Sequence, residues 1–142
     1  MGLRRKGREI ALQTLYAMEY PSECEGEPME ACKEKLLEIA ETREMETDEK
    51  IVEFSLEILR NTVANLEAID AKIAEHSTNW SKDKIAMIDL CILRIAAYEL
   101  LFTPTPPAIV MNEAIEIAKK YASESSGKFV NGILNSISVE LK

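Results

Sequence analysis

Apolar side chains recur at helical spacing in nearly every segment of this chain, and no stretch alternates convincingly with the period of two that is typical of a strand. Residues 10–18 are one example, because Ala11, Leu12, Leu15 and Met18 fall on one face at about 100° per residue. An aromatic content of 6% suits a core of Leu, Ile, Ala and Met better than a sheet. The pattern predicts an all-α bundle of six or seven helices. The length of 142 residues favours one domain over residues 1–142.

Breaks in the periodicity divide the chain into expected helices. The first begins in the basic start of the chain and ends before residues 20–28, which contain two prolines and a glycine. A third helix is expected from near Asp48, and a fourth helical stretch carries Leu66, Ile69 and Ile73. These two stretches are either continuous or separated by a bend near Asn65. Residues 82–102 are apolar around most of the helix circumference, which is typical of a central, buried helix. The remaining helices are expected at about 29–41, 110–121 and 128–141. Asp48 is the expected N-cap of the third helix, and Ser81 is the expected N-cap of the helix over residues 82–102.

Positive charge is concentrated at the start of a chain whose formal net charge is −8. Such an acidic body repels phosphates, but a local basic patch can still bind nucleic acid with strong salt dependence. The patch is either a solubilising, frayed terminus or an arginine-rich arm for RNA or DNA. We expect the stem of Arg8 to pack and its head to reach solvent. The patch consists of Arg4, Arg5, Lys6 and Arg8.

Two residues next to the basic patch favour the nucleic-acid alternative. Gln13 and Tyr16 are expected on the polar face of the same helix. A glutamine amide can read a base edge, and a tyrosine ring can stack on an unpaired base. The sequence therefore offers six candidate RNA-binding side chains in its first helix.

Most kinds of catalytic and metal chemistry lack their usual residues here. Cys24, Cys32 and Cys91 contain no CxxC pair, and His76 is the single histidine, so we expect neither a zinc site nor a disulfide framework. His76 is more consistent with a surface-loop residue than with a catalytic one. We expect no catalytic residues, no metal and no cofactor, reduced thiols, a cytoplasmic location and no membrane span.

A Gly-Lys pair within "SSGKFVNG", residues 125–132, raises the question of a phosphate-binding loop. That loop requires an earlier glycine where this chain has Ala122, and a Ser or Thr where it has Phe129. A helix also precedes the pair, whereas the loop follows a strand, so we reject nucleotide binding. Two alternatives remain for Lys128: a phosphate contact near a helix N-terminus, or an exposed lysine on a capped helix.

Three ordered blocks together resemble the NusB family of bacterial transcription antitermination factors. The first is "RRKGREIALQTLYAMEY", with a basic start followed by R-E-x-A-x-Q-x-L-Y. The second is "IDLCILRIAAYELLF", and the third is "VMNEAIEIAKKYASESSGKFVNGILNSI". The basic run is short, because glycine occupies position 7. The resemblance covers nearly the whole chain and is far more specific than any one block.

This resemblance implies two packed three-helix bundles and a role in antitermination. It implies binding to single-stranded boxA RNA of ribosomal RNA leaders together with NusE, a small-subunit ribosomal protein, within an RNA polymerase antitermination complex. It also allows for a homodimer. Carried over by position, the RNA-binding residues would be Arg4, Arg5, Lys6, Arg8, Gln13, Tyr16, Lys128 and Phe129.

The same resemblance places Asp89 at the NusE interface. Asp89 lies in the apolar stretch expected to form the central helix, where a carboxylate needs solvent, an internal base such as Arg94, or a partner protein. Two other functions stay open at this point. One is a helical protein–protein adaptor without RNA binding. The other is a stand-alone domain related to the RNA-binding domain of RNA cytosine methyltransferases.

Overall fold

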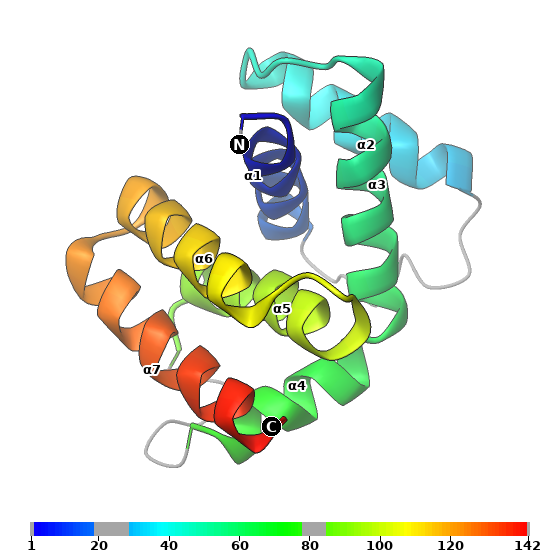
Figure 1. Cartoon of the computed structure of the whole chain (residues 1–142). Coiled ribbons are helices and arrows are strands. Elements are labelled where there is room, and N and C mark those ends of the chain that lie inside the picture. Colours follow the sequence, from blue (N-terminus) through cyan, green and yellow to red (C-terminus); the bar gives the residue numbers. More distant parts are fainter. Residues whose placement is uncertain (1, 19–28, 78–84, 142) are drawn as a thin grey trace. The chain divides into compact units, whose positions relative to one another are not determined.

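A computed structural model describes residues 2–18, 29–77 and 85–141 (Figure 1). These residues form seven α-helices and no strand, which confirms the predicted all-α class. None of the described helices is both long and apolar enough to cross a membrane. The chain divides into two compact units, Met1–Ala64 and Asn65–Lys142. The helices are α1 Gly2–Ala17, α2 Met29–Thr42, α3 Glu49–Ala64, α4 Leu66–Glu75, α5 Met87–Phe102, α6 Pro107–Tyr121 and α7 Glu124–Glu140.

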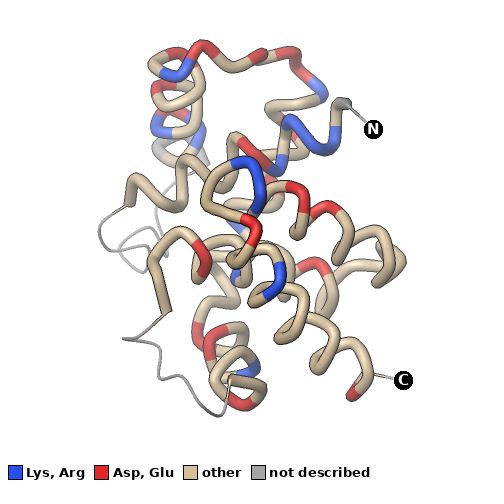
Figure 2. The backbone as a smooth tube through the Cα atoms, turned by 90° about the vertical axis from the view of Figure 1, so that its left-hand side faces the viewer, with Lys and Arg blue, Asp and Glu red and all other residues tan. Residues whose placement is uncertain are grey.

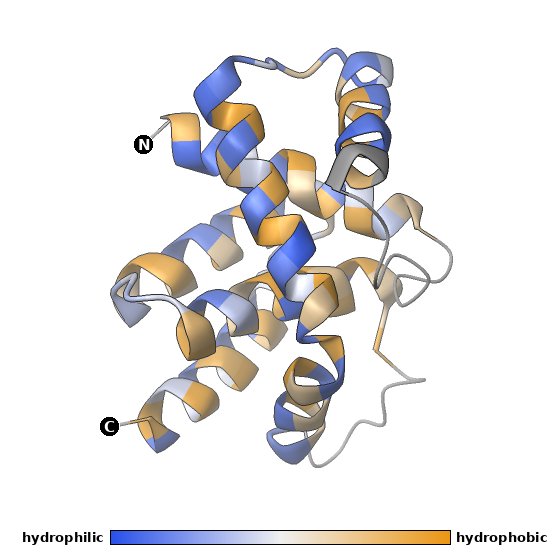
Figure 3. Ribbon diagram, turned by 90° about the vertical axis from the view of Figure 1, so that its right-hand side faces the viewer, coloured by the Kyte–Doolittle hydropathy of each residue, from blue (hydrophilic) through white to orange (hydrophobic). Residues whose placement is uncertain are grey.

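The first unit is a three-helix arrangement in which α1 packs mainly on α3, and α2 contacts both. Its apolar stripes face inward, as the periodicity predicts, while hydrophilic residues occupy the other sides of the helices (Figure 3). Asp48 caps α3, because its Oδ1 accepts a hydrogen bond from the backbone N–H of Lys50 at 2.8 Å. The core of this unit includes Ile10, Ala11, Leu12, Leu15, Leu36, Ile51, Ile58 and Leu59.

The second unit is organised around α5, which contacts α4, α6 and α7, while α6 and α7 pack side by side. Every residue of α5 from Asp89 to Leu100 is buried. The prediction of a central, buried helix is therefore confirmed. Asn65 separates α3 from α4, so the two stretches that the sequence left undecided are distinct helices.

Three helix starts differ from the sequence-based expectation. The central helix begins at Met87, because Ile85 is a bend and Ala86 has a non-helical backbone with φ −56° and ψ 138°. The expected cap Ser81 lies outside the described residues. Helix α6 begins earlier than predicted, at Pro107, since proline is well suited to the first helical position.

The start of α7 is the difference that matters for function. The expected separator 122–127 is largely helical, because Ser123 caps the helix by accepting a hydrogen bond from the Ser126 N–H at 3.1 Å. Lys128 therefore lies in the second turn of α7, not at its N-terminus.

Candidate nucleic-acid interface

The basic patch occupies the first two turns of α1, and Figure 2 shows basic residues following one another at this end of the chain. Arg4 and Lys6 are exposed and Arg5 is half-buried. The first turn of α1 contains no acidic residue, and the N-terminal end of a helix carries a partial positive charge. This end of α1 can therefore attract an anion such as a phosphate.

Phe54 of α3 lies against the basic patch. The guanidinium carbons of Arg4 and Arg8 are each 5.4 Å from the centroid of its ring, within the range of a cation–π contact. Gly7 lies against the same ring, and a Cβ atom added there would be 2.7 Å from Phe54 Cδ2. The helical periodicity of the sequence does not reveal this arrangement, because it joins residues of two different helices.

Arg8 does not behave as predicted. Its head was expected in solvent, but the residue is 3% exposed and its guanidinium lies over Phe54. The helical wheel gives the direction of a side chain along one helix, but a neighbouring helix such as α3 can cover a long side chain to its end. Arg8 is therefore a buried cation in this structure.

Gln13 is a second correction. Gln13 was expected on the polar face of α1, yet it is 5% exposed, and Glu9, one turn earlier, is 6% exposed. Periodicity identifies the apolar stripe of a helix. It does not show whether the polar side chains outside that stripe are exposed or are covered by other parts of the protein. Tyr16, by contrast, is 45% exposed and keeps an accessible ring.

Lys6 has an acidic neighbour. Its Nζ is 2.8 Å from Glu46 Oε1, and the two side chains are 47% and 52% exposed. An exposed pair of this kind contributes only about 0–1 kcal/mol and is screened by salt. Lys6 can therefore exchange Glu46 for a phosphate at little cost.

The Gly-Lys pair in α7 has a packing explanation. A Cβ at Gly127 would lie 3.3 Å from Lys119 Cγ, so the glycine permits the close approach of α6 and α7. The Gly127 N–H donates to the Ser123 carbonyl oxygen and is not free for an anion. The predicted position of Lys128 at a helix N-terminus is therefore wrong, whereas its contact with a phosphate stays a prediction. Lys128 is exposed and Phe129 is half-buried.

Asp89 lies in the first turn of α5 and is 8% exposed. Its Oδ1 has no hydrogen-bond partner among the described residues. Arg94 is not its partner, because Arg94 Nε and Nη2 donate to the two carboxylate oxygens of Asp70 at 2.8 and 2.9 Å. A buried carboxylate with an unfilled acceptor is expensive unless something else supplies a donor.

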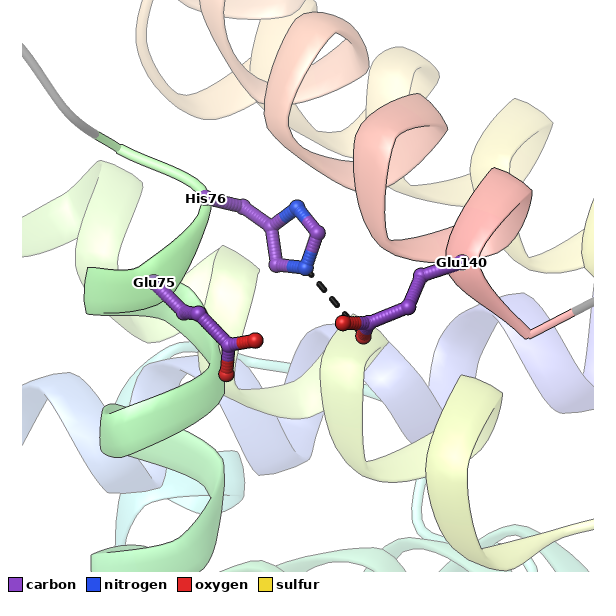
Figure 4. A group of neighbouring side chains, drawn as sticks. All are labelled: Glu75, His76 and Glu140. Carbon is purple, nitrogen blue, oxygen red and sulfur yellow. Dashed lines mark hydrogen bonds and ion pairs between the residues drawn. The ribbon is translucent and has the colours of Figure 1, made fainter.

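His76 is more than a loop residue, since it terminates α4 and contacts α7 (Figure 4). Its Nδ1 is 2.7 Å from Ser136 Oγ, and its Nε2 is 3.2 Å from Glu140 Oε2. Ligand atoms of Glu75, His76 and Glu140 lie within 4.8 Å of one another. Lys72 Nζ already lies 2.9 Å from Glu140 and 3.3 Å from Glu75, so an internal cation serves both carboxylates.

Comparison with known proteins decides the family. The model of the NusB family matches residues 5–139. This chain belongs to the NusB family. The resemblance carried by the three sequence blocks is thereby confirmed. A curated relative, the transcription antitermination protein NusB of Citrifermentans bemidjiense, is 42% identical over 138 residues, which cover 96% of this chain and 94% of that protein.

Solved structures of NusB proteins share the fold. A structure of the antitermination factors NusB and NusE in complex with dsRNA matches with a TM-score of 0.79 and 28% identity, covering 99% of this chain and 98% of that one. NusB from T. maritima matches with a TM-score of 0.76 and 36% identity, covering 96% and 91% of the two chains. The NusB fold therefore extends over nearly the whole chain.

Proposed function

We propose that this NusB-family chain is a transcription antitermination factor of the cytoplasm that binds boxA RNA together with NusE and joins the RNA polymerase antitermination complex. The observation that carries the proposal is the exposed basic end of α1 on a chain of net charge −8. The likeness to a NusB–NusE–RNA structure supports the choice of both partners. In this proposal, residues 1–142 form a single RNA-binding domain.

The accessible side chains divide the work of binding RNA. Arg4, Arg5 and Lys6 neutralise phosphates, and the exposed ring of Tyr16 stacks on an unpaired base. Lys128 and Phe129 are proposed as further RNA contacts through charge and stacking. Arg8 and Gln13 act indirectly in this proposal, because both are buried.

Asp89 is the proposed contact to NusE. Its buried Oδ1 accepts no hydrogen bond from the described residues, so a donor from a partner protein would satisfy it. The acidic chain also suits a ribosomal protein, because electrostatic complementarity with a basic partner speeds encounter.

Titration of boxA RNA at two or more salt concentrations, with and without NusE, tests this function. Four accessible basic side chains, Arg4, Arg5, Lys6 and Lys128, predict a log–log salt slope of roughly −3 for single-stranded RNA. We expect weak binding alone, tighter binding with NusE, and a preference for boxA over a scrambled sequence.

The same titration separates the alternatives. A helical adaptor without RNA binding gives NusE binding and no RNA binding at any salt concentration. A double-stranded boxA probe is a useful second arm, because the solved NusB–NusE complex contains dsRNA. Equal affinity for all RNA sequences in the presence of NusE contradicts the proposed specificity.

A further inference from the structure

We propose that Phe54 is a positioning residue for the RNA-binding end of α1: its ring fixes the Arg4 guanidinium in an orientation ready to receive a phosphate. The inference rests on the proposed function for the identity of the ligand. The juxtaposition itself lies within the first unit and depends on α1 and α3 alone.

The geometry places one ring among three neighbouring positions of α1. Arg8 is four positions after Arg4, and Gly7 is three positions after it, so all three lie on the side of α1 that faces Phe54. Both guanidinium carbons are 5.4 Å from the ring centroid. The buried Arg8 is held against this ring, whereas Arg4 is exposed and can meet both the ring and a ligand.

Glycine at position 7 supports a specific role for the ring. Glycine inside a helix is destabilising relative to alanine, so its presence in the second turn of α1 calls for a reason. A Cβ there would approach Phe54 Cδ2 to 2.7 Å, and one of the two would have to move. The glycine that shortens the basic run therefore permits the close approach of the Phe54 ring to this part of α1.

Phe54 also differs from the core residues on its own helix. Ile51 and Ile58 are at most 2% exposed, whereas Phe54 is only half-buried. A residue needed only for packing would not require an aromatic face at this position, because leucine can fill an apolar gap. The ring face attracts a guanidinium, and a half-buried ring leaves the outer side of that guanidinium open.

Restricting Arg4 before binding reduces the conformational entropy lost when a phosphate arrives. Fixing one long side chain in advance corresponds to about a twofold to tenfold gain in affinity. The number of phosphates neutralised does not change. Loss of the ring should therefore weaken RNA binding without altering its salt slope, and this separates positioning from direct contact.

The test compares Phe54→Leu with Phe54→Tyr in the full-length chain. Without RNA, NMR of the Arg4 side chain should show a ring-current shift in the wild type and Phe54→Tyr that is absent in Phe54→Leu. With boxA RNA, Phe54→Leu should raise the Kd about twofold to tenfold at an unchanged salt slope. Phe54→Tyr keeps an aromatic ring and should bind RNA as the wild type does. Phe54→Leu should have no further effect in an Arg4→Ala background.

A substitution on the exposed side of the contact keeps the test valid if Phe54→Leu does not fold. Arg4→Lys keeps the charge but loses the planar guanidinium, so it should weaken RNA binding, whereas Arg60→Lys on α3 should not. Unchanged affinity in folded Phe54→Leu, or in Arg4→Lys, overturns the role of Phe54 while RNA binding by the wild type stands. Absence of RNA binding by the wild type overturns the proposed function and this inference together.

Discussion

Arg94 of α5 holds the carboxylate of Asp70 of α4 with two hydrogen bonds, from Nε to Oδ1 at 2.8 Å and from Nη2 to Oδ2 at 2.9 Å. The two side chains are 5% and 16% exposed. Such a bidentate pair is stronger and more directional than a single hydrogen bond between neutral groups. It fixes α4 against the central helix of the second unit and leaves Asp89 without Arg94 as a partner.

Arg94→Leu should lower the free energy of unfolding by about 3–5 kcal/mol, because it leaves a largely buried carboxylate without its cation. Urea denaturation followed by circular dichroism measures the change. Arg60→Leu, at an exposed position of α3, should change stability by no more than about 0.5 kcal/mol. A double change, Arg94→Leu with Asp70→Leu, should be less harmful than the two single effects added together. Equal losses for Arg94→Leu and Arg60→Leu would contradict the importance of this pair.

Arg5→Ala and Arg8→Ala should separate RNA binding from stability. Arg5→Ala should weaken binding to boxA RNA and make the salt slope shallower by about 0.7, with little effect on the melting temperature. Arg8→Ala should destabilise the protein by about 1–3 kcal/mol, because a buried side chain and its contact with Phe54 are lost. Thermal melts beside RNA titrations measure both. A full loss of RNA affinity in stable Arg8→Ala would show that Arg8 contacts RNA directly.

Asp89→Asn should weaken NusE binding by about 2–5 kcal/mol, because it removes a charge at a buried interfacial contact. It should leave the free protein equally stable or more stable, since an unsatisfied buried carboxylate is costly. Asp89→Lys should weaken NusE binding further and leave RNA binding by the free protein nearly intact. Calorimetry with NusE and an RNA titration measure these effects. Glu116→Gln on α6 is the control, and unchanged NusE affinity in folded Asp89→Asn would place the interface elsewhere.

The Lys72–His76–Glu140 network should make stability depend on pH at both ends of the scale. Hydrogen bonds from Lys72 and then His76 lower the pKa of Glu140 below its usual value of 4.5. The stabilising contribution of Glu140 is therefore present above the unfolded-state pKa and is lost as pH falls through the folded-state pKa. The pKa of Lys72 is raised above 10.5, chiefly by its hydrogen bond to Glu140, so its contribution disappears as pH rises through that higher value.

Glu140→Gln should therefore reduce the loss of stability on acidification below about pH 4.5 and also the loss at the alkaline end. Urea denaturation from pH 3 to 11 measures both limbs, with Glu67→Gln on α4 as the matched control. Parallel curves for Glu140→Gln and the wild type would show that this network contributes nothing to stability.

The helical periodicity was sufficient to predict the fold class, and the three motif blocks were sufficient to predict the family. The stripe Ala11, Leu12 and Leu15 is buried, and the helix around Leu93 is central, because apolar burial follows directly from which residues are apolar. Helix starts were less predictable. Each start depends on which nearby side chain caps the helix, and in α7 the cap is Ser123, five residues before Lys128.

Tertiary structure decided which polar side chains are buried and which partners they have. Arg8 and Gln13 lie on a helix with a clear apolar stripe, yet both are buried, and the residue that lies against Arg8 is Phe54 of another helix. Arg94 finds Asp70 across 24 residues, and His76 finds Glu140 across 64. Periodicity describes one helix at a time, whereas a buried polar group is satisfied by whichever element packs against it. The sequence by itself therefore determined the helices, the core stripes and the family, and only the packing of those helices decided which charges face solvent, which face Phe54 and which are paired inside.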